Sequence, residues 1–150
     1  MTRPHERSAD NGFTLDILIN IDVDDLRRAE AFYTRAFGLA VGRRLGPDIV
    51  ELTGGSSPIY LLVKADGSEA GAAADRRRYR RHWTPVHLDF VVDDLDQALE
   101  RATQAGARQE GDVGSFDWGR IATLADPFGH GFCLIQFLGR GYDALVDERP

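Results

Sequence analysis

The chain contains an internal repeat, and this repeat restricts its possible folds more than any other feature. Residues 17–26, with the sequence ILINIDVDDL, align without a gap to residues 86–95, VHLDFVVDDL, at an offset of 69 residues. In both copies every second residue is apolar, which is the period of a β-strand with one packed face. The Asp-Asp-Leu after each strand predicts a helix start, because a short carboxylate accepts hydrogen bonds from the free N–H groups of a first helical turn.

Each copy continues as a helix and three strands. Apolar residues at helical spacing predict helices over residues 26–37 and 95–105. The predicted caps are an aspartate before and a glycine after each helix: Asp24 or Asp25 with Gly38, and Asp93 or Asp94 with Gly106. Alternating stretches predict the strands, at 40–45, 48–52 and 59–63 in the first copy and at 108–111, 120–124 and 132–137 in the second. The sequence therefore predicts an α+β fold of two βαβββ modules.

The modules divide the chain into five segments. We expect a flexible N-terminus at 1–12, a first module at 13–66, a basic linker at 67–84, a second module at 85–138 and a C-terminal tail at 139–150. The basic run in the linker, RRRYRR, is typical of a solvated connection balanced by nearby acids, with an anion-recruiting lid as the alternative.

Composition excludes several classes of function. A net charge of -6 disfavours binding to nucleic acid, because phosphates repel an acidic surface. No apolar run approaches the length of a membrane helix, so we expect no membrane partner. The single cysteine, Cys133, cannot form a disulfide within the chain, which favours a reducing cytoplasm.

Several motifs resemble those of one protein family. They are Val23-Asp24-Asp25-Leu26 with Ala31-Phe32-Tyr33 and Phe37-Gly38-Leu39, then Val92-Asp93-Asp94-Leu95 with Ala105-Gly106-Ala107, and finally Ala125-Asp126-Pro127-Phe128-Gly129-His130. In this order and spacing, over about residues 15–138, they resemble the vicinal oxygen chelate (VOC) superfamily, which includes glyoxalases, bleomycin- and fosfomycin-resistance proteins and ring-cleaving dioxygenases. The resemblance implies curved mixed sheets around a cavity, and a homodimer whose subunit interface completes that cavity.

The resemblance also implies where a metal would bind. Metal-dependent members use one side chain from the first strand and one from the fourth strand of each copy. Those positions correspond here to Leu18, Tyr60, His87 and Cys133. Leucine offers no ligand atom and neutral tyrosine is a poor ligand, so we expect no conventional metal centre and no cofactor. A divalent metal, if present, would be bound by His87 with Cys133 or Tyr60.

Strand alternation gives a second, independent view of the cavity. The residues opposite the helices would combine apolar walls with polar groups, as small-molecule sites commonly do. The candidate ligand-binding residues are Leu18, Asn20, Tyr60, Leu62, His87, Asp89, Trp118, Arg120, Cys133, Ile135 and Phe137. His87 and Asp89 stand two apart on one strand, so they share a face and form a candidate catalytic base and its orienting carboxylate.

Two functions remain open at this point. The first is metal-independent binding of a small amphipathic molecule. The second is a glyoxalase-type isomerase or lyase that uses His87 as a base or as a ligand of a degenerate metal site. A ring-cleaving dioxygenase is disfavoured, because its iron site needs two imidazoles and a carboxylate.

Overall fold

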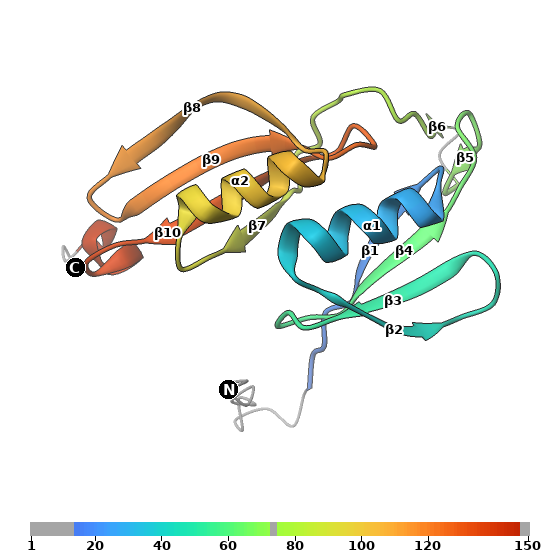
Figure 1. The fold of residues 1–150 in the computed structure, drawn as a ribbon, viewed down its shortest axis with the longest axis horizontal. Coiled ribbons are helices and arrows are strands. Elements are labelled where there is room, and N and C mark those ends of the chain that lie inside the picture. Colours follow the sequence, from blue (N-terminus) through green and yellow to red (C-terminus); the bar gives the residue numbers. More distant parts are fainter. Residues whose placement is uncertain (1–13, 73–74, 148–150) are drawn as a thin grey trace.

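The computed structural model describes residues 14–72 and 75–147, so the flexible N-terminus expected at 1–12 lies outside the described residues. The first module contains β1 (Ile19–Val23), α1 (Leu26–Phe37), β2 (Ala40–Arg44), β3 (Ile49–Thr53) and β4 (Ile59–Val63). The second contains β7 (Leu88–Val91), α2 (Leu95–Ala105), β8 (Arg108–Phe116), β9 (Gly119–Ala125) and β10 (Gly131–Phe137). Two short strands, β5 (Glu69–Ala70) and β6 (Asp75–Arg76), lie between the modules, and a 3-10 helix, η1 (Gly141–Leu145), follows them (Figure 1).

Both modules have the same topology. The sheet order is β1-β4-β3-β2 in the first and β7-β10-β9-β8 in the second. In each sheet the strand that precedes the helix pairs in parallel with the last strand, and the other pairs are antiparallel. This arrangement confirms the predicted α+β fold of two βαβββ modules.

The helix boundaries agree with those predicted, and the structure identifies the capping residue at each start. The side chain of Asp25 accepts a hydrogen bond from the Arg28 N–H at 3.1 Å, and Asp94 accepts one from Gln97 at the same distance. Gly38 ends α1 in the left-handed region (φ 66°), where glycine is favoured because it has no Cβ. Local capping chemistry therefore determines both ends of α1.

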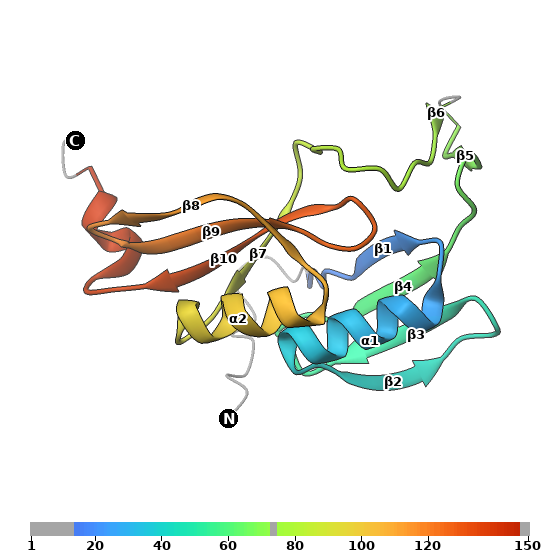
Figure 2. The same ribbon diagram turned by 45° about the horizontal axis from the view of Figure 1, so that its top comes forward.

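The two modules are joined chiefly through their helices. Figures 1 and 2 show α1 and α2 end to end on the same side of both sheets. At their junction the Phe37 ring stacks on Phe90 with centroids 4.0 Å apart, next to the buried Phe132. In the part of the chain that the structure describes, no strand of one four-stranded sheet pairs with a strand of the other, so the sheets do not close into a barrel.

A buried hydrogen bond also crosses between the modules. The Tyr33 hydroxyl on α1 donates to Asp126 Oδ2 at 2.5 Å, and Asp126 lies in the turn between β9 and β10. The other oxygen of Asp126 accepts from the backbone N–H groups of Phe128 and His130 at 2.8 and 2.9 Å. The Asp-Pro-Phe-Gly-His motif therefore forms a turn that is stabilised by its own aspartate and is bound to α1 through one tyrosine.

The linker is held in place by ion pairs. Arg77 Nε lies 2.6 Å from Asp22 Oδ2 on β1, and Arg81 forms two 2.6 Å contacts with Glu110 on β8. His82 forms an isolated parallel bridge with His130. The linker therefore touches both modules, and these two arginines are matched by acids.

Three local expectations are wrong. The first strand begins at Ile19 rather than at residue 17, and Ile17 and Leu18 are 63% and 60% exposed. The equivalent strand of the second module, β7, begins at Leu88 rather than at residue 86, so Val86 and His87 lie just ahead of it. The third-last strand, β8, runs to Phe116 rather than ending at residue 111, with a register shift between Glu110 and Gly114. Alternation in the sequence is interrupted at that irregularity, which is why the strand was predicted too short.

No described helix is long and apolar enough to cross a membrane.

Candidate functional site

A row of polar side chains crosses the second sheet on the face away from α2. Successive strands place Asp89, Cys133, Thr123 and Glu110 side by side, because Cys133 is the register partner of both Asp89 and Thr123, and Thr123 is the partner of Glu110. The neighbouring residues on β10, Phe132 and Leu134, point the opposite way and are buried in the core. Strand alternation thus separates a polar face from an apolar one.

The three residues at one end of this row have converging ligand atoms. His87 Nε2 lies 3.2 Å from Asp89 Oδ1, and one ligand atom each of His87, Asp89 and Cys133 lie within 4.8 Å of one another. His87 and Asp89 are partly exposed, whereas Cys133 is buried. Burial raises the pKa of the Cys133 thiol, and the neighbouring Asp89 adds to this, so the thiol is protonated at neutral pH and is a poor nucleophile.

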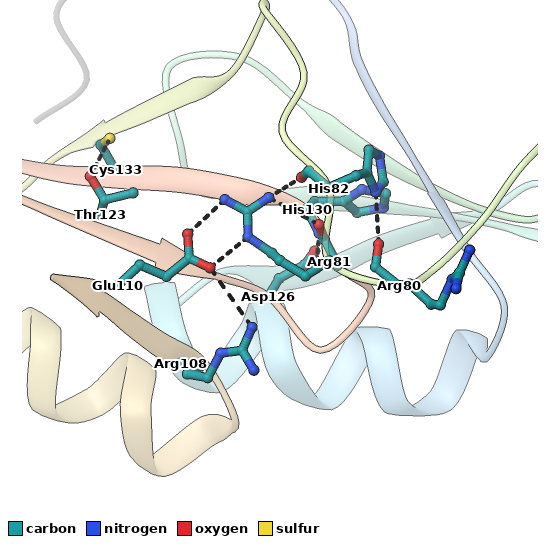
Figure 3. A network of polar contacts seen from close by, with 10 residues as sticks. Arg80, Arg81, His82, Arg108, Glu110, Thr123, Asp126, His130 and Cys133 are labelled. Carbon is teal, nitrogen blue, oxygen red and sulfur yellow. Dashed lines mark hydrogen bonds and ion pairs between the residues drawn. The ribbon is translucent and has the colours of Figure 1, made fainter.

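The linker covers the start of β10 on this same face. Arg81 holds Glu110 with two parallel hydrogen bonds and donates to the His82 carbonyl, as Figure 3 shows. The hydrogen bonds from Arg81 hold the pKa of Glu110 below its usual range. Next along the chain, the Trp83 ring lies 4.8 Å from the His87 ring, centroid to centroid, at a 43° tilt. Trp83 therefore joins the His87–Asp89 pair at the edge of the polar row.

The first module carries an equivalent row with different chemistry. Asn20, Tyr60 and Glu51 are register neighbours on β1, β4 and β3. The Tyr60 hydroxyl donates to Glu51 Oε2 at 2.8 Å, and Arg43 holds the same carboxylate with contacts of 2.6 to 3.2 Å. Hydrogen bonds from Arg43 and then Tyr60 lower the pKa of Glu51 to about 2. The Glu51 carboxylate is therefore ionised, and its charge is neutralised by Arg43 of the same module.

The structure brings some of the candidate residues together and separates others. Asp89 and Cys133 are on the second sheet, with His87 directly before β7. Asn20, Tyr60 and Leu62 are on the first sheet, and no strand pairing joins the two sets in the described chain. Leu18 lies exposed ahead of β1. The polar face of the second sheet continues along β10 through the buried Ile135 to Phe137.

One of the residues assigned to the cavity face was misplaced. Arg120 alternates with the buried Ala122 and Leu124 on the helix side of β9, and it forms an ion pair with Asp96 of α2 at 2.9 Å. Alternation defines the two faces of a strand but not which face meets the helix, and the side was chosen wrongly for Arg120. Trp118 lies in the turn before β9, where its ring stacks on Phe116 with centroids 5.4 Å apart and lies 6.2 Å from the ring of Phe137 on the polar face.

A hollow lies between the modules. It has a volume of about 630 Å³ and is lined by the end of α1, the 54–57 loop, β7 and the start of α2, including Phe37, Asp89 and Asp94. It reaches the polar row only at Asp89. This hollow therefore does not enclose all the predicted residues.

Sequence reasoning missed five residues of the polar faces. They are Glu51, Arg81, Trp83, Glu110 and Thr123. A charged Glu51 within the otherwise apolar strand Ile49–Thr53 was a readable signal, because an isolated carboxylate in a buried strand needs a partner. The contacts of Arg81 and Trp83 had no local signal, since they depend on how the linker crosses the second sheet.

Comparison with known proteins determines the family. Residues 18–135 match the glyoxalase-like domain family. The chain belongs to this family. Solved structures of the glyoxalase, bleomycin resistance and dioxygenase group share its fold.

Individual relatives are moderately similar. The anthracycline biosynthesis protein DnrV of Streptomyces peucetius is 28% identical over 128 residues, which cover 85% of this chain and 43% of that protein. The uncharacterized protein Mb0911c of Mycobacterium bovis is 30% identical over 118 residues, 76% of this chain and 78% of that one. The fosfomycin resistance protein FosX of Listeria monocytogenes has the same fold, with a TM-score of 0.64, 18% identity, and coverage of 84% and 95%. The chain thus spans less than half the length of the anthracycline biosynthesis relatives.

The metal cage that the fold family implies does not fit the residues present. Of the four positions, Leu18 has no ligand atom, and the Tyr60 hydroxyl donates its proton to Glu51. These four positions therefore supply two ligands, His87 and Cys133, fewer than the three or more that such sites use. Asp89, which is not one of the four positions, has a ligand atom within 4.8 Å of theirs.

Proposed function

We propose that the protein binds a small amphipathic molecule on the polar face of the second sheet, without a conventional metal centre. The observation that carries this proposal is the partly exposed His87–Asp89 pair beside the exposed ring of Trp83. Small-molecule sites typically combine an apolar or aromatic surface with a few polar groups that orient the ligand. His87 and Asp89 supply the polar anchors, and Trp83 supplies the apolar area.

The relatives support a small-molecule role. FosX is named for fosfomycin resistance and DnrV for anthracycline biosynthesis, and both names concern small natural products. The net charge of -6 favours the binding of neutral or cationic molecules and disfavours the binding of nucleic acid. The lone cysteine fits a reducing cytoplasm as the place of action.

We also propose that a second copy of the chain completes the pocket. The polar rows of one chain lie on separate sheets, and apolar residues flank both edge strands, with Leu18 60% exposed and Val86 85% exposed. Pairing two chains would cover these side chains and enclose the polar faces. Light scattering at micromolar concentration should give a dimer mass, and a monomer mass would contradict this part of the proposal.

Ligand binding can be tested without knowing the natural ligand. A panel of neutral, cationic and anionic amphipathic molecules is screened for an increase in melting temperature, with and without EDTA. We expect hits whose dissociation constants, measured by calorimetry, are unchanged by EDTA. Loss of every hit with EDTA, or no hit at all, would overturn metal-independent binding.

A glyoxalase-type isomerase or lyase is the second candidate function. The convergence of His87, Asp89 and Cys133 within 4.8 Å favours it, since the same groups could serve as a base or as ligands of a degenerate metal site. Elemental analysis after dialysis discriminates between the two functions. Stoichiometric metal that is lost in the Cys133→Ser variant would favour the enzyme, whereas metal-free protein that binds ligand favours the binding role.

A further inference from the structure

A tryptophan of the linker packs against the second sheet at a position where the strand carries a glycine and therefore no side chain. Gly131 occupies a position on the polar face of β10, two residues before Cys133. A Cβ at Gly131 would lie 2.8 Å from two ring atoms of Trp83 and 2.8 Å from Arg81 Nη2, closer than real Cβ atoms approach. Trp83 and Arg81 thus pack directly on the backbone of β10, and they can do so because residue 131 is glycine.

The seated tryptophan is fixed but accessible. The Arg81 guanidinium lies over its ring at 5.6 Å from the centroid, and His87 contacts it at 4.8 Å. Arg81 is itself fixed by Glu110 with two 2.6 Å contacts. Half of the Trp83 surface nevertheless remains exposed. An aromatic ring that is oriented before binding loses little conformational entropy when a ligand stacks on it.

The surrounding charges restrict the ligand further. The positive charge of Arg81 is compensated by Glu110, so this arginine is not a free anion receptor. The Asp89 carboxylate is 38% exposed and lies 3.2 Å from His87 Nε2, and the His87 ring in turn lies next to Trp83. A negative group next to an aromatic face attracts cations and hydrogen-bond donors and repels anions.

We propose that Trp83 is the stacking platform of the site, and that its ligand is a planar aromatic molecule, neutral or cationic, whose polar edge meets His87 and Asp89. This inference rests on the proposed binding function and names its ligand class. It assigns to the linker a direct part in binding, through Trp83 rather than through the arginines of the basic run. It also explains why residue 131 is glycine at a strand position with no positive φ.

The test compares two planar probes of opposite charge by titration calorimetry: proflavine, a cation, and anthraquinone-2-sulfonate, an anion. We expect wild-type protein to bind proflavine more tightly than the sulfonate. Trp83→Leu should weaken proflavine binding by about tenfold, the magnitude of one lost aromatic and cation–π contact, while Trp83→Phe loses less. Gly131→Ala should give a similar loss by displacing the ring.

Phe116→Leu is the matched control, because Phe116 is another exposed aromatic residue and lies at the opposite end of the second sheet, as the register partner of Gly119. Its affinity for proflavine should stay within twofold of wild type. In Trp118→Phe, where Trp83 is the remaining tryptophan, proflavine should still quench the emission.

Each other outcome has a defined meaning. Equal affinity of Trp83→Leu and wild type, or a larger loss in Phe116→Leu, overturns the platform while leaving ligand binding intact. Tighter binding of the anion overturns the charge assignment. If amphipathic molecules from the panel bind but neither planar probe does, the aromatic ligand class is wrong, whereas absence of all binding refutes the proposed function itself.

Discussion

The hydrogen bond between Tyr33 and Asp126 should be a main source of coupling between the two modules. Both side chains are buried, Tyr33 on α1 and Asp126 in the β9–β10 turn. Burial, together with the charge of Asp126, raises the pKa of Tyr33 well above its ordinary value. The tyrosine is therefore a proton donor throughout the neutral range, and the contact is a charge-assisted hydrogen bond that stabilises the folded chain.

The cost of Tyr33→Phe follows from what remains after the change. Asp126 keeps two backbone donors, from Phe128 and His130, so the carboxylate is not left without partners. The loss is then that of one hydrogen bond to a charged group, about 2 kcal/mol. Asp126→Ala removes the acceptor of all three donors and should cost about 4 kcal/mol, because buried donors without partners carry a desolvation penalty.

Urea unfolding followed by fluorescence measures both values. For a chain of this length, a loss of about 2 kcal/mol should lower the melting temperature by about 4 to 8 °C. Tyr142→Phe is the control, since it removes a hydroxyl from a half-exposed tyrosine and should change stability by less than about 0.5 kcal/mol. A Tyr33→Phe variant as stable as the control would refute the reasoning, as would equal costs for Tyr33→Phe and Asp126→Ala.

Three further variants test the site and its supports. His87→Gln should weaken ligand binding at least several-fold while leaving urea stability nearly unchanged, and an equal loss of both would make His87 a structural residue. For Glu51, the pKa of about 2 lies below the ordinary 4.5, so its ion pair stabilises the fold above about pH 4.5 and is lost as the pH falls towards 2. Glu51→Gln should therefore be less stable at pH 6 and should show a flatter decline in unfolding free energy between pH 5 and 2.5; parallel profiles would contradict this. Gly129→Ala should destabilise the chain by about 2 to 3 kcal/mol, because φ is +84° and a Cβ would lie 2.5 Å from the Arg80 carbonyl; a melting temperature within 2 °C of wild type would show that the linker yields there.

Local chemistry explains why the helices and the fold class could be predicted. The helix ends depend on residues within one turn, as Asp25 and Gly38 show for α1. The repeat then imposed the same topology on both halves. Alternation likewise placed His87 and Asp89 on one face, and their 3.2 Å contact is what that spacing permits.

Tertiary contacts explain where the sequence interpretation was wrong or incomplete. Arg120 was assigned to the cavity because alternation does not tell which side of β9 meets the helix, although the apolar Ala122 and Leu124 on the same face indicated the core. Trp83 was missed because its position depends on Gly131, 48 residues further along the chain. No pattern within the linker encodes that contact.

The two polar rows show how the duplicated modules have come to differ in chemistry. In the first row, Glu51 is neutralised by Arg43 and hydrogen-bonded by Tyr60, so its charge is satisfied within the module. In the second row, His87 is the one partner of Asp89 among the ion pairs of the described residues, and Asp89 remains partly exposed. A satisfied carboxylate stabilises its own sheet, whereas an exposed one can exchange water for a ligand. The second module is therefore the half whose polar groups are available to a ligand. Arg43→Ala, which removes the ion-pair partner of Glu51, should destabilise the fold without creating a second binding site in the first module. Two bound ligands per chain in calorimetry would refute this difference between the modules.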